Sequence, residues 1–126
     1  MKRLWLGIGV LAAFLAASLL LSWYLPELHR ELSDNLSAAA QAAEKSDWEE
    51  ATRLAGGAKH RWEQNRHFVA SFTDHEPLEN LDSLFEELEV YRTAKLTVDY
   101  AATCVQLSQL CLAIAESHCL TWWNLL

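Results

Sequence analysis

Three side chains of types that bind metals recur along one stretch of the chain: His60, Glu63 and His67. Offsets of three and seven return to nearly the same face of an α-helix, so the three side chains share that face. Such a set could contribute to a divalent metal site. However, two histidines seven residues apart are separated by about 10 Å along the helix axis, and they could not both bind one ion without strain. We therefore interpret these residues as a solvated polar face.

The three cysteines, Cys104, Cys111 and Cys119, follow one another at spacings of seven and eight residues. The first two fall on one helical stripe about 10 Å apart, which is too far for a disulfide between them. No Cys-x-x-Cys motif occurs, so neither a redox centre nor a zinc knuckle is indicated. We expect Cys104 and Cys111 to be small core residues. Cys119 could form an intermolecular bridge in an oxidising compartment.

The remaining candidates carry weaker signals. His75 lies between two acidic residues, and we interpret it as a capping or turn residue rather than a catalytic one. A second acidic run contains Glu86, Glu87 and Glu89. It lacks the Asp-x-Asp-x-Asp-Gly loop of a calcium site, and no serine, cysteine or threonine lies in a nucleophile motif. The sequence thus predicts no catalytic residue, no cofactor-binding residue, no cofactor and no metal ligand, and it favours a protein that is not an enzyme.

The elements that would position these residues are helices. Ala, Leu and Glu dominate, only two prolines occur, and there is almost no strand pattern. Apolar residues recur at helical spacing and predict helices over about 27–44, 47–72, 77–94 and 98–118. The turn near Lys95–Thr97 is weakly marked, and without it the last two helices would form one long helix. A faint similarity between 46–51 and 96–101 favours two helical hairpins rather than a repeat array.

Several residues predict where helices begin and end. Pro26 suits the first turn of a new helix and would let the chain bend. Ser46 and Glu49 have the spacing of a capping box. Gly56-Gly57 indicates either a bend or the close approach of another helix. In the third helix the polar face is expected to hold Glu79, Asp82, Ser83, Glu86 and Glu89.

Residues 4–25, LWLGIGVLAAFLAASLLLSWYL, contain no charge and directly follow Lys2 and Arg3. As a helix they reach about 33 Å, enough to cross a hydrocarbon core of about 30 Å. A cleaved signal peptide has a shorter apolar region, whereas this run stays apolar past the weak cleavage site at 16–18. Trp23 and Tyr24 lie where an interfacial aromatic belt belongs. We expect an uncleaved single-pass signal-anchor; a cleaved signal and a buried core helix are the alternatives.

The charges flanking this run predict the topology. Lys2 and Arg3 precede it, whereas Glu27 and Glu31 follow it with Arg30 as the only nearby base. The positive-inside rule then places the N-terminus in the cytoplasm and residues 26–126 outside. Of the ten Lys and Arg, two precede the run, so residues 26–126 hold 8 against 17 Asp and Glu and carry a formal charge of −9. This acidity argues against nucleic acid and against charge-driven binding to anionic lipids.

A wider pattern resembles a known family. It comprises the basic start, one membrane span, the Asp-Trp-Glu-x-Ala helix start at 47–51, and Trp62 on the helix that follows this start. An aromatic-rich segment ending in His75-Glu76, a leucine-rich helix and a terminal Asn124-Leu125 complete it. The chain is similar to the small membrane-anchored bacterial proteins grouped as domain of unknown function 4363. The resemblance implies a single-span helical protein, mostly from spore-forming bacteria and sometimes encoded beside another membrane protein. It brings no established activity and no catalytic residues.

The last seven residues, 120–126, are too short to span a membrane and too apolar to extend into water. They could pack on the domain, return to the bilayer interface or dock on a partner. We expect an all-α protein: residues 1–25 form a cytoplasmic stub and transmembrane anchor, and residues 26–126 form an extracytoplasmic bundle of three to four helices in antiparallel hairpins.

The expected function is that of a non-enzymatic interaction or accessory module. It would be held in the cell membrane by contact of residues 4–25 with the lipid bilayer, with another membrane protein as a possible partner. The alternative is a ligand- or metal-sensing domain that uses the groove between the hairpins. The sequence predicts neither the partner nor the oligomeric state.

Overall fold

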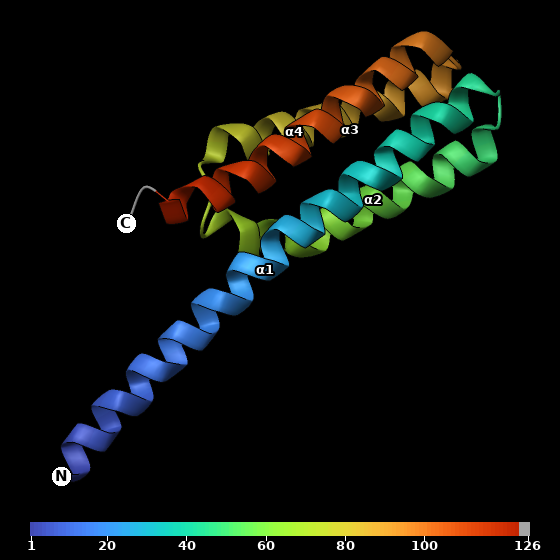
Figure 1. Cartoon of the computed structure of the whole chain (residues 1–126). Coiled ribbons are helices and arrows are strands. Elements are labelled where there is room, and N and C mark those ends of the chain that lie inside the picture. The colour runs from blue at the N-terminus through green and yellow to red at the C-terminus, as the bar shows by residue number, and fades with distance from the viewer. Residues whose placement is uncertain (124–126) are drawn as a thin grey trace.

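The structure is a computed structural model that describes the backbone of residues 1–123 and the side chains of residues 1–117. Over that range the chain is all-α. Its four helices are α1 (Lys2–Glu44), α2 (Trp48–Ala70), α3 (His75–Ala94) and α4 (Thr97–Trp123). Each helix runs back along the one before it, which gives an up-and-down four-helix bundle (Figure 1). The predicted all-α class and the two antiparallel hairpins are confirmed.

Helix α1 continues through Pro26, so the expected helix break there is wrong. A proline inside a helix removes one backbone hydrogen bond and costs about 3 kcal/mol or more. Here Pro26 is itself buried, between the buried Leu25 and Leu28. The burial of this turn against the bundle opposes the cost of the missing hydrogen bond, and the chain keeps its helical path. The apolar run and the first bundle helix are therefore one element.

The two halves of α1 have opposite surroundings. The N-terminal part of α1, drawn in blue in Figure 1, projects from the bundle; Tyr24 already contacts α2, and Leu25 is the first buried residue. By length and composition, two of the described helices could cross a membrane: α1, and the part of α4 from Thr97 to Ser117. None of the apolar stretch in α1 is buried, whereas half of the stretch in α4 is buried inside the bundle. The apolar side chains of α4 therefore contribute to the core of the bundle.

The core lies where the second half of α1 packs against α4 and α2. The large side chains Leu28, Leu32 and Leu36 of α1 are fully buried together with residues of the other three helices. Nearer the first hairpin turn the buried residues of α1 and α2 are almost all alanines: Ala39, Ala40, Ala42, Ala43, Ala51, Ala55 and Ala58. Because the spacing between packed helices depends on the side chains at the contact, this alanine zone lets α1 and α2 approach closely.

Both hairpins end their first helix in the same way. Ser46 and Lys95 are the two non-glycine residues with positive φ among those described, at 61° and 57°. In the first turn the N–H of Asp47 donates to the carbonyl of Ala42 at 2.9 Å. The N–H of Leu96 donates to the carbonyl of Tyr91 at 3.0 Å in the second. These 6→1 hydrogen bonds define Schellman motifs, and the second one separates α3 from α4.

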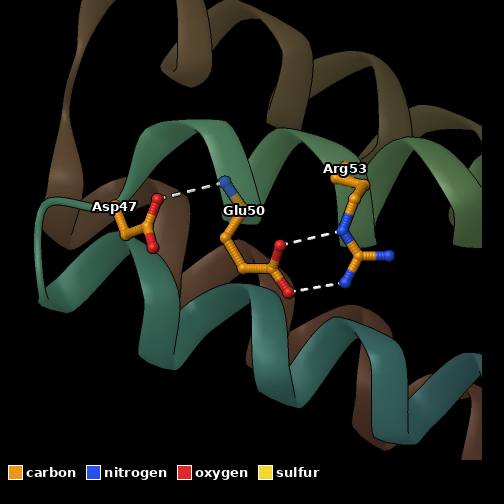
Figure 2. Close-up of polar contacts among 3 residues, drawn as sticks. All are labelled: Asp47, Glu50 and Arg53. Atoms are coloured by element: carbon orange, nitrogen blue, oxygen red, sulfur yellow. Dashed lines mark hydrogen bonds and ion pairs between the residues drawn. The ribbon is translucent and has the colours of Figure 1, made fainter.

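The N-terminus of α2 differs from the predicted capping box. Ser46 is occupied in closing α1, so Asp47 becomes the N-cap and its side chain accepts from the N–H of Glu50 at 3.2 Å (Figure 2). Glu50 then binds Arg53 through two hydrogen bonds. The predicted Ser46–Glu49 pair is wrong by one residue, because the left-handed backbone of Ser46 is incompatible with the extended conformation of an N-cap.

Gly56 and Gly57 lie on the exposed face of a continuous α2, and a Cβ built on either would meet no atom within 4 Å. The close approach that the sequence left open is therefore absent. Replacing both glycines with alanine is expected to raise the free energy of unfolding by about 1–2 kcal/mol, since alanine restricts the unfolded chain and favours the helix. Urea denaturation followed by circular dichroism measures this change. A decrease in stability would show that the glycines have a structural role in α2.

Candidate functional site

The residues that the sequence singled out for metal chemistry lie on the outside of the bundle. His60, Glu63 and His67 are all exposed on α2. Across the part of the chain whose side chains are described, no three His, Cys, Asp or Glu residues are placed to hold a metal ion. His75 is the exposed first residue of α3, preceded by its N-cap Asp74. The glutamates of α3 are also exposed, and one of them, Glu89, pairs with Arg92.

The most connected polar group joins α2 to α3 around Asp82. The indole Nε1 of Trp62 donates to Oδ1 of Asp82 at 2.8 Å, and Nε of Arg66 donates to Oδ2 at 2.7 Å. The two partners come from successive turns of α2, so one carboxylate receives both bonds. We had expected Asp82 on the solvated face of its helix; its side chain is still 34% exposed, but its carboxylate bonds to two side chains of α2. The Trp62 ring is fully buried, and its N–H can only be satisfied by a group that reaches inward.

A fully buried histidine, His29 of α1, contacts the ring of Trp62. Its Nδ1 is 2.8 Å from the carbonyl oxygen of Leu25, and its ring meets the Trp62 ring edge-to-face with centroids 6.3 Å apart. Sequence reasoning missed this residue. The signal was its place one residue after Leu28, within the apolar stripe of the same helix.

Three serine hydroxyls connect α1 with α4. Oγ of Ser108 is 2.6 Å from Oγ of Ser33 and 3.0 Å from Oγ of Ser37. Ser33 and Ser108 are buried. A buried hydroxyl is costly unless it has a hydrogen-bond partner, so this set specifies one register between the two helices. The spacing of Ser33 and Ser37 by one helical turn was the only sequence signal for it.

The two described cysteines are core residues, as predicted. Cys104 and Cys111 are fully buried and both are free thiols. Burial raises the pKa of each thiol from 9.0 to about 12, so both stay protonated at neutral pH. Because the thiolate is the nucleophile, neither is suited to covalent chemistry. Cys119 and the tail 120–126 lie outside the residues whose side chains are described.

This burial predicts a loss of stability at high pH. Above the ordinary thiol pKa of 9.0 the unfolded chain releases protons that the folded bundle keeps, so the free energy of unfolding falls. Between pH 8 and pH 10 the expected loss is about 1 kcal/mol per thiol. Urea titrations at both pH values should show a smaller loss for the Cys104→Ala/Cys111→Ala variant than for the parent. Equal losses would mean that the two thiols do not contribute.

The polar contacts of Asp82 and Ser108 share one property: each joins two helices. Asp82 connects α3 to two side chains of α2, and Ser108 connects α4 to α1. Their donors and acceptors are directed at neighbouring protein groups rather than into a shared cavity. Chemically, the arrangement can fix the relative positions of the helices.

Together the fold and these contacts define a class of protein. It is a small four-helix bundle with side-chain hydrogen bonds between its helices, and its first helix extends beyond the bundle as an apolar helix. The chain belongs to the family described as Domain of unknown function (DUF4363), whose model matches residues 19–125. The expected family resemblance is thus confirmed. No curated protein and no solved structure matches the chain.

Proposed function

We propose that this protein is a non-enzymatic interaction or accessory module held at the cell membrane. Residues 4–25 would cross the bilayer once with the N-terminus in the cytoplasm, and the helical bundle would lie outside. The observation that carries the proposal is the continuity of α1, which passes from an unburied apolar stretch into the centre of the core without a linker. Its 43 residues form one rod of about 65 Å.

A continuous rod has a mechanical consequence. A flexible linker would let a tethered domain explore many orientations, whereas α1 supplies Leu28, Leu32 and Leu36 to the same core that its outer half anchors. Tilting or rotating the anchor therefore moves the bundle with it. This coupling suits a module that presents one face to a neighbouring membrane protein or reports a change in the position of one.

The polar chemistry of the bundle also favours this proposal over an enzyme. Asp82 and the buried serines are engaged in bonds between helices, and burial keeps both described thiols protonated. The histidines and glutamates of α2 and α3 that first suggested a site are spread over exposed helix faces.

Two measurements test the proposal. A reporter fused to the C-terminus that is active only outside the cytoplasm is expected to be active, and a cytoplasmic signal would reverse the topology. Purification in mild detergent is expected to retain a stoichiometric membrane protein. The comparison is a soluble form that begins at Ser22, which keeps the buried Leu25 and Pro26, and it should lose that partner. Equal recovery with both forms would show that the anchor is not required.

The alternative is a ligand-sensing module, favoured by a hollow of about 570 Å³ beside the turn between α2 and α3. Its lining combines polar residues with an apolar wall from α4: Ser71, Phe72, Thr73, Asp74, Pro77, Leu110, Ala113, Ile114 and Ser117. Its volume falls in the usual range for small-molecule sites. Native mass spectrometry of the purified protein distinguishes the two functions, since a bound small molecule in place of a protein partner would favour the sensor.

A further inference from the structure

Three aromatic rings form a row that starts at the point where the bare half of α1 leaves the bundle. The ring of Tyr24 on α1 meets the ring of Phe68 on α2 edge-to-face, with centroids 6.2 Å apart. Phe68 in turn meets Phe72, in the turn between α2 and α3, with centroids 5.5 Å apart. We call Tyr24, Phe68 and Phe72 the aromatic row.

The aromatic row is outside the core. Tyr24, Phe68 and Phe72 are 38%, 41% and 50% exposed, whereas Val69, next to Phe68, is fully buried. Transferring a phenylalanine side chain out of water contributes roughly 1.5–3 kcal/mol. Isolated exposed apolar residues are common, but contiguous ones mark a surface that contacts something else.

The position of the row along α1 is fixed by the helix itself. Tyr24 is the last residue but one of the charge-free run 4–25, and its hydroxyl donates to Oδ1 of Asn65 on α2 at 2.9 Å. Because α1 is continuous, Phe68, which contacts Tyr24, and Phe72, which contacts Phe68, lie within about one or two turns of the end of that run. A helix that enters the hydrocarbon near residue 4 reaches the opposite interface at this level. Aromatic side chains are enriched at that depth.

We propose that the aromatic row inserts into the interfacial layer of the bilayer, so that the end of the bundle formed by the α2–α3 turn rests on lipid. This inference rests on the proposed membrane anchor. The attraction is apolar rather than electrostatic, because residues 26–126 carry a formal charge of −9 and the adjoining turn contains Asp74 and Glu76. Zwitterionic lipid, which has no net charge, is therefore sufficient for this contact. Two contacts, α1 within the bilayer and the row at its surface, would hold the bundle at one height and tilt.

Depth-dependent quenching in the full-length protein tests this contact. An environment-sensitive fluorophore is attached to single cysteines in a Cys119→Ser background, where Cys104 and Cys111 are buried. The variants are Phe72→Cys for the row, Leu11→Cys for the anchor, and Val98→Cys as a matched control. Val98 is 81% exposed and lies just after the turn between α3 and α4, at the opposite end of the bundle. Each protein is reconstituted in phosphatidylcholine vesicles with a nitroxide on the acyl chain, and circular dichroism confirms the fold.

The expected result is quenching at positions 11 and 72 that is roughly twofold or more above that at position 98. Quenching at position 11, with position 72 behaving like position 98, would overturn the lipid contact and leave the anchor intact. Equal absence of quenching at all three positions would overturn both. Protection of position 72 from a water-soluble quencher without lipid quenching would show that protein covers the row, and would also overturn the inference.

Discussion

Truncating Trp62 to alanine is expected to lower the free energy of unfolding by about 3–5 kcal/mol. The indole is fully buried, its ring meets the His29 ring edge-to-face, and its Nε1 donates to Asp82. Alanine would leave a cavity between α1, α2 and α3 and remove one bond to the Asp82 carboxylate. The free energy of unfolding of small domains is about 5–15 kcal/mol, so this single change would remove a large share of it.

A second substitution separates packing from hydrogen bonding. Trp62→Phe keeps most of the buried ring but removes the donor, and we expect a smaller loss of about 1–2 kcal/mol because Arg66 still binds Asp82. Both values come from urea denaturation of the full-length protein in mild detergent, followed by circular dichroism. A loss below about 1 kcal/mol for Trp62→Ala would mean that Trp62 does not organise the bundle.

Placing arginines at Leu11 and Leu15 is expected to move the protein from the membrane fraction to the soluble fraction. Each arginine near the centre of a spanning helix costs about 2.5–3.5 kcal/mol on the insertion scale, so the pair costs about 5–7 kcal/mol. Both positions lie on the exposed part of α1, where Leu11 and Leu15 are 63% and 55% exposed, and the fold should be unaffected. Membrane fractionation with immunodetection measures the partition.

The matched control for that change is Leu11→Ile together with Leu15→Ile, which preserves apolarity and should stay with the membrane. Circular dichroism of the arginine variant checks that the four helices persist. Should the arginine variant still sediment with membranes as the control does, residues 4–25 do not act as the anchor. An unfolded arginine variant would instead indicate that the outer half of α1 packs on protein.

Much of the fold could be predicted because its signals are local. Three of the predicted helices correspond to α2, α3 and α4. The break near Lys95–Thr97 is real as well, with Lys95 in the left-handed conformation. Periodic apolar spacing and turn residues act within a few positions of one another, so they can be interpreted without knowing what the helix packs against.

The errors have a common physical origin. Pro26 resembles a helix start when its neighbours alone are considered, but burial of Leu25 and Leu28 keeps the helix intact. Ser46 resembles an N-cap until the preceding helix requires it for closure. Asp82 resembles a solvated residue until the buried Trp62 N–H needs an acceptor. In each case a contact with another part of the chain outweighs a local preference.

The sequence by itself determined that this is a helical protein with a charge-free segment of 22 residues ahead of an acidic domain. Composition and period 3.6 are sufficient for that conclusion, because they depend only on neighbouring residues. Only the tertiary structure decided that the segment and the first bundle helix are one rod, and that His29, Trp62 and Asp82 meet. It also placed Phe68 beside Tyr24, at the end of the charge-free run, and Phe72 beside Phe68. Such contacts join residues up to 44 positions apart (Tyr24 and Phe68), and they form only when whole helices pack together.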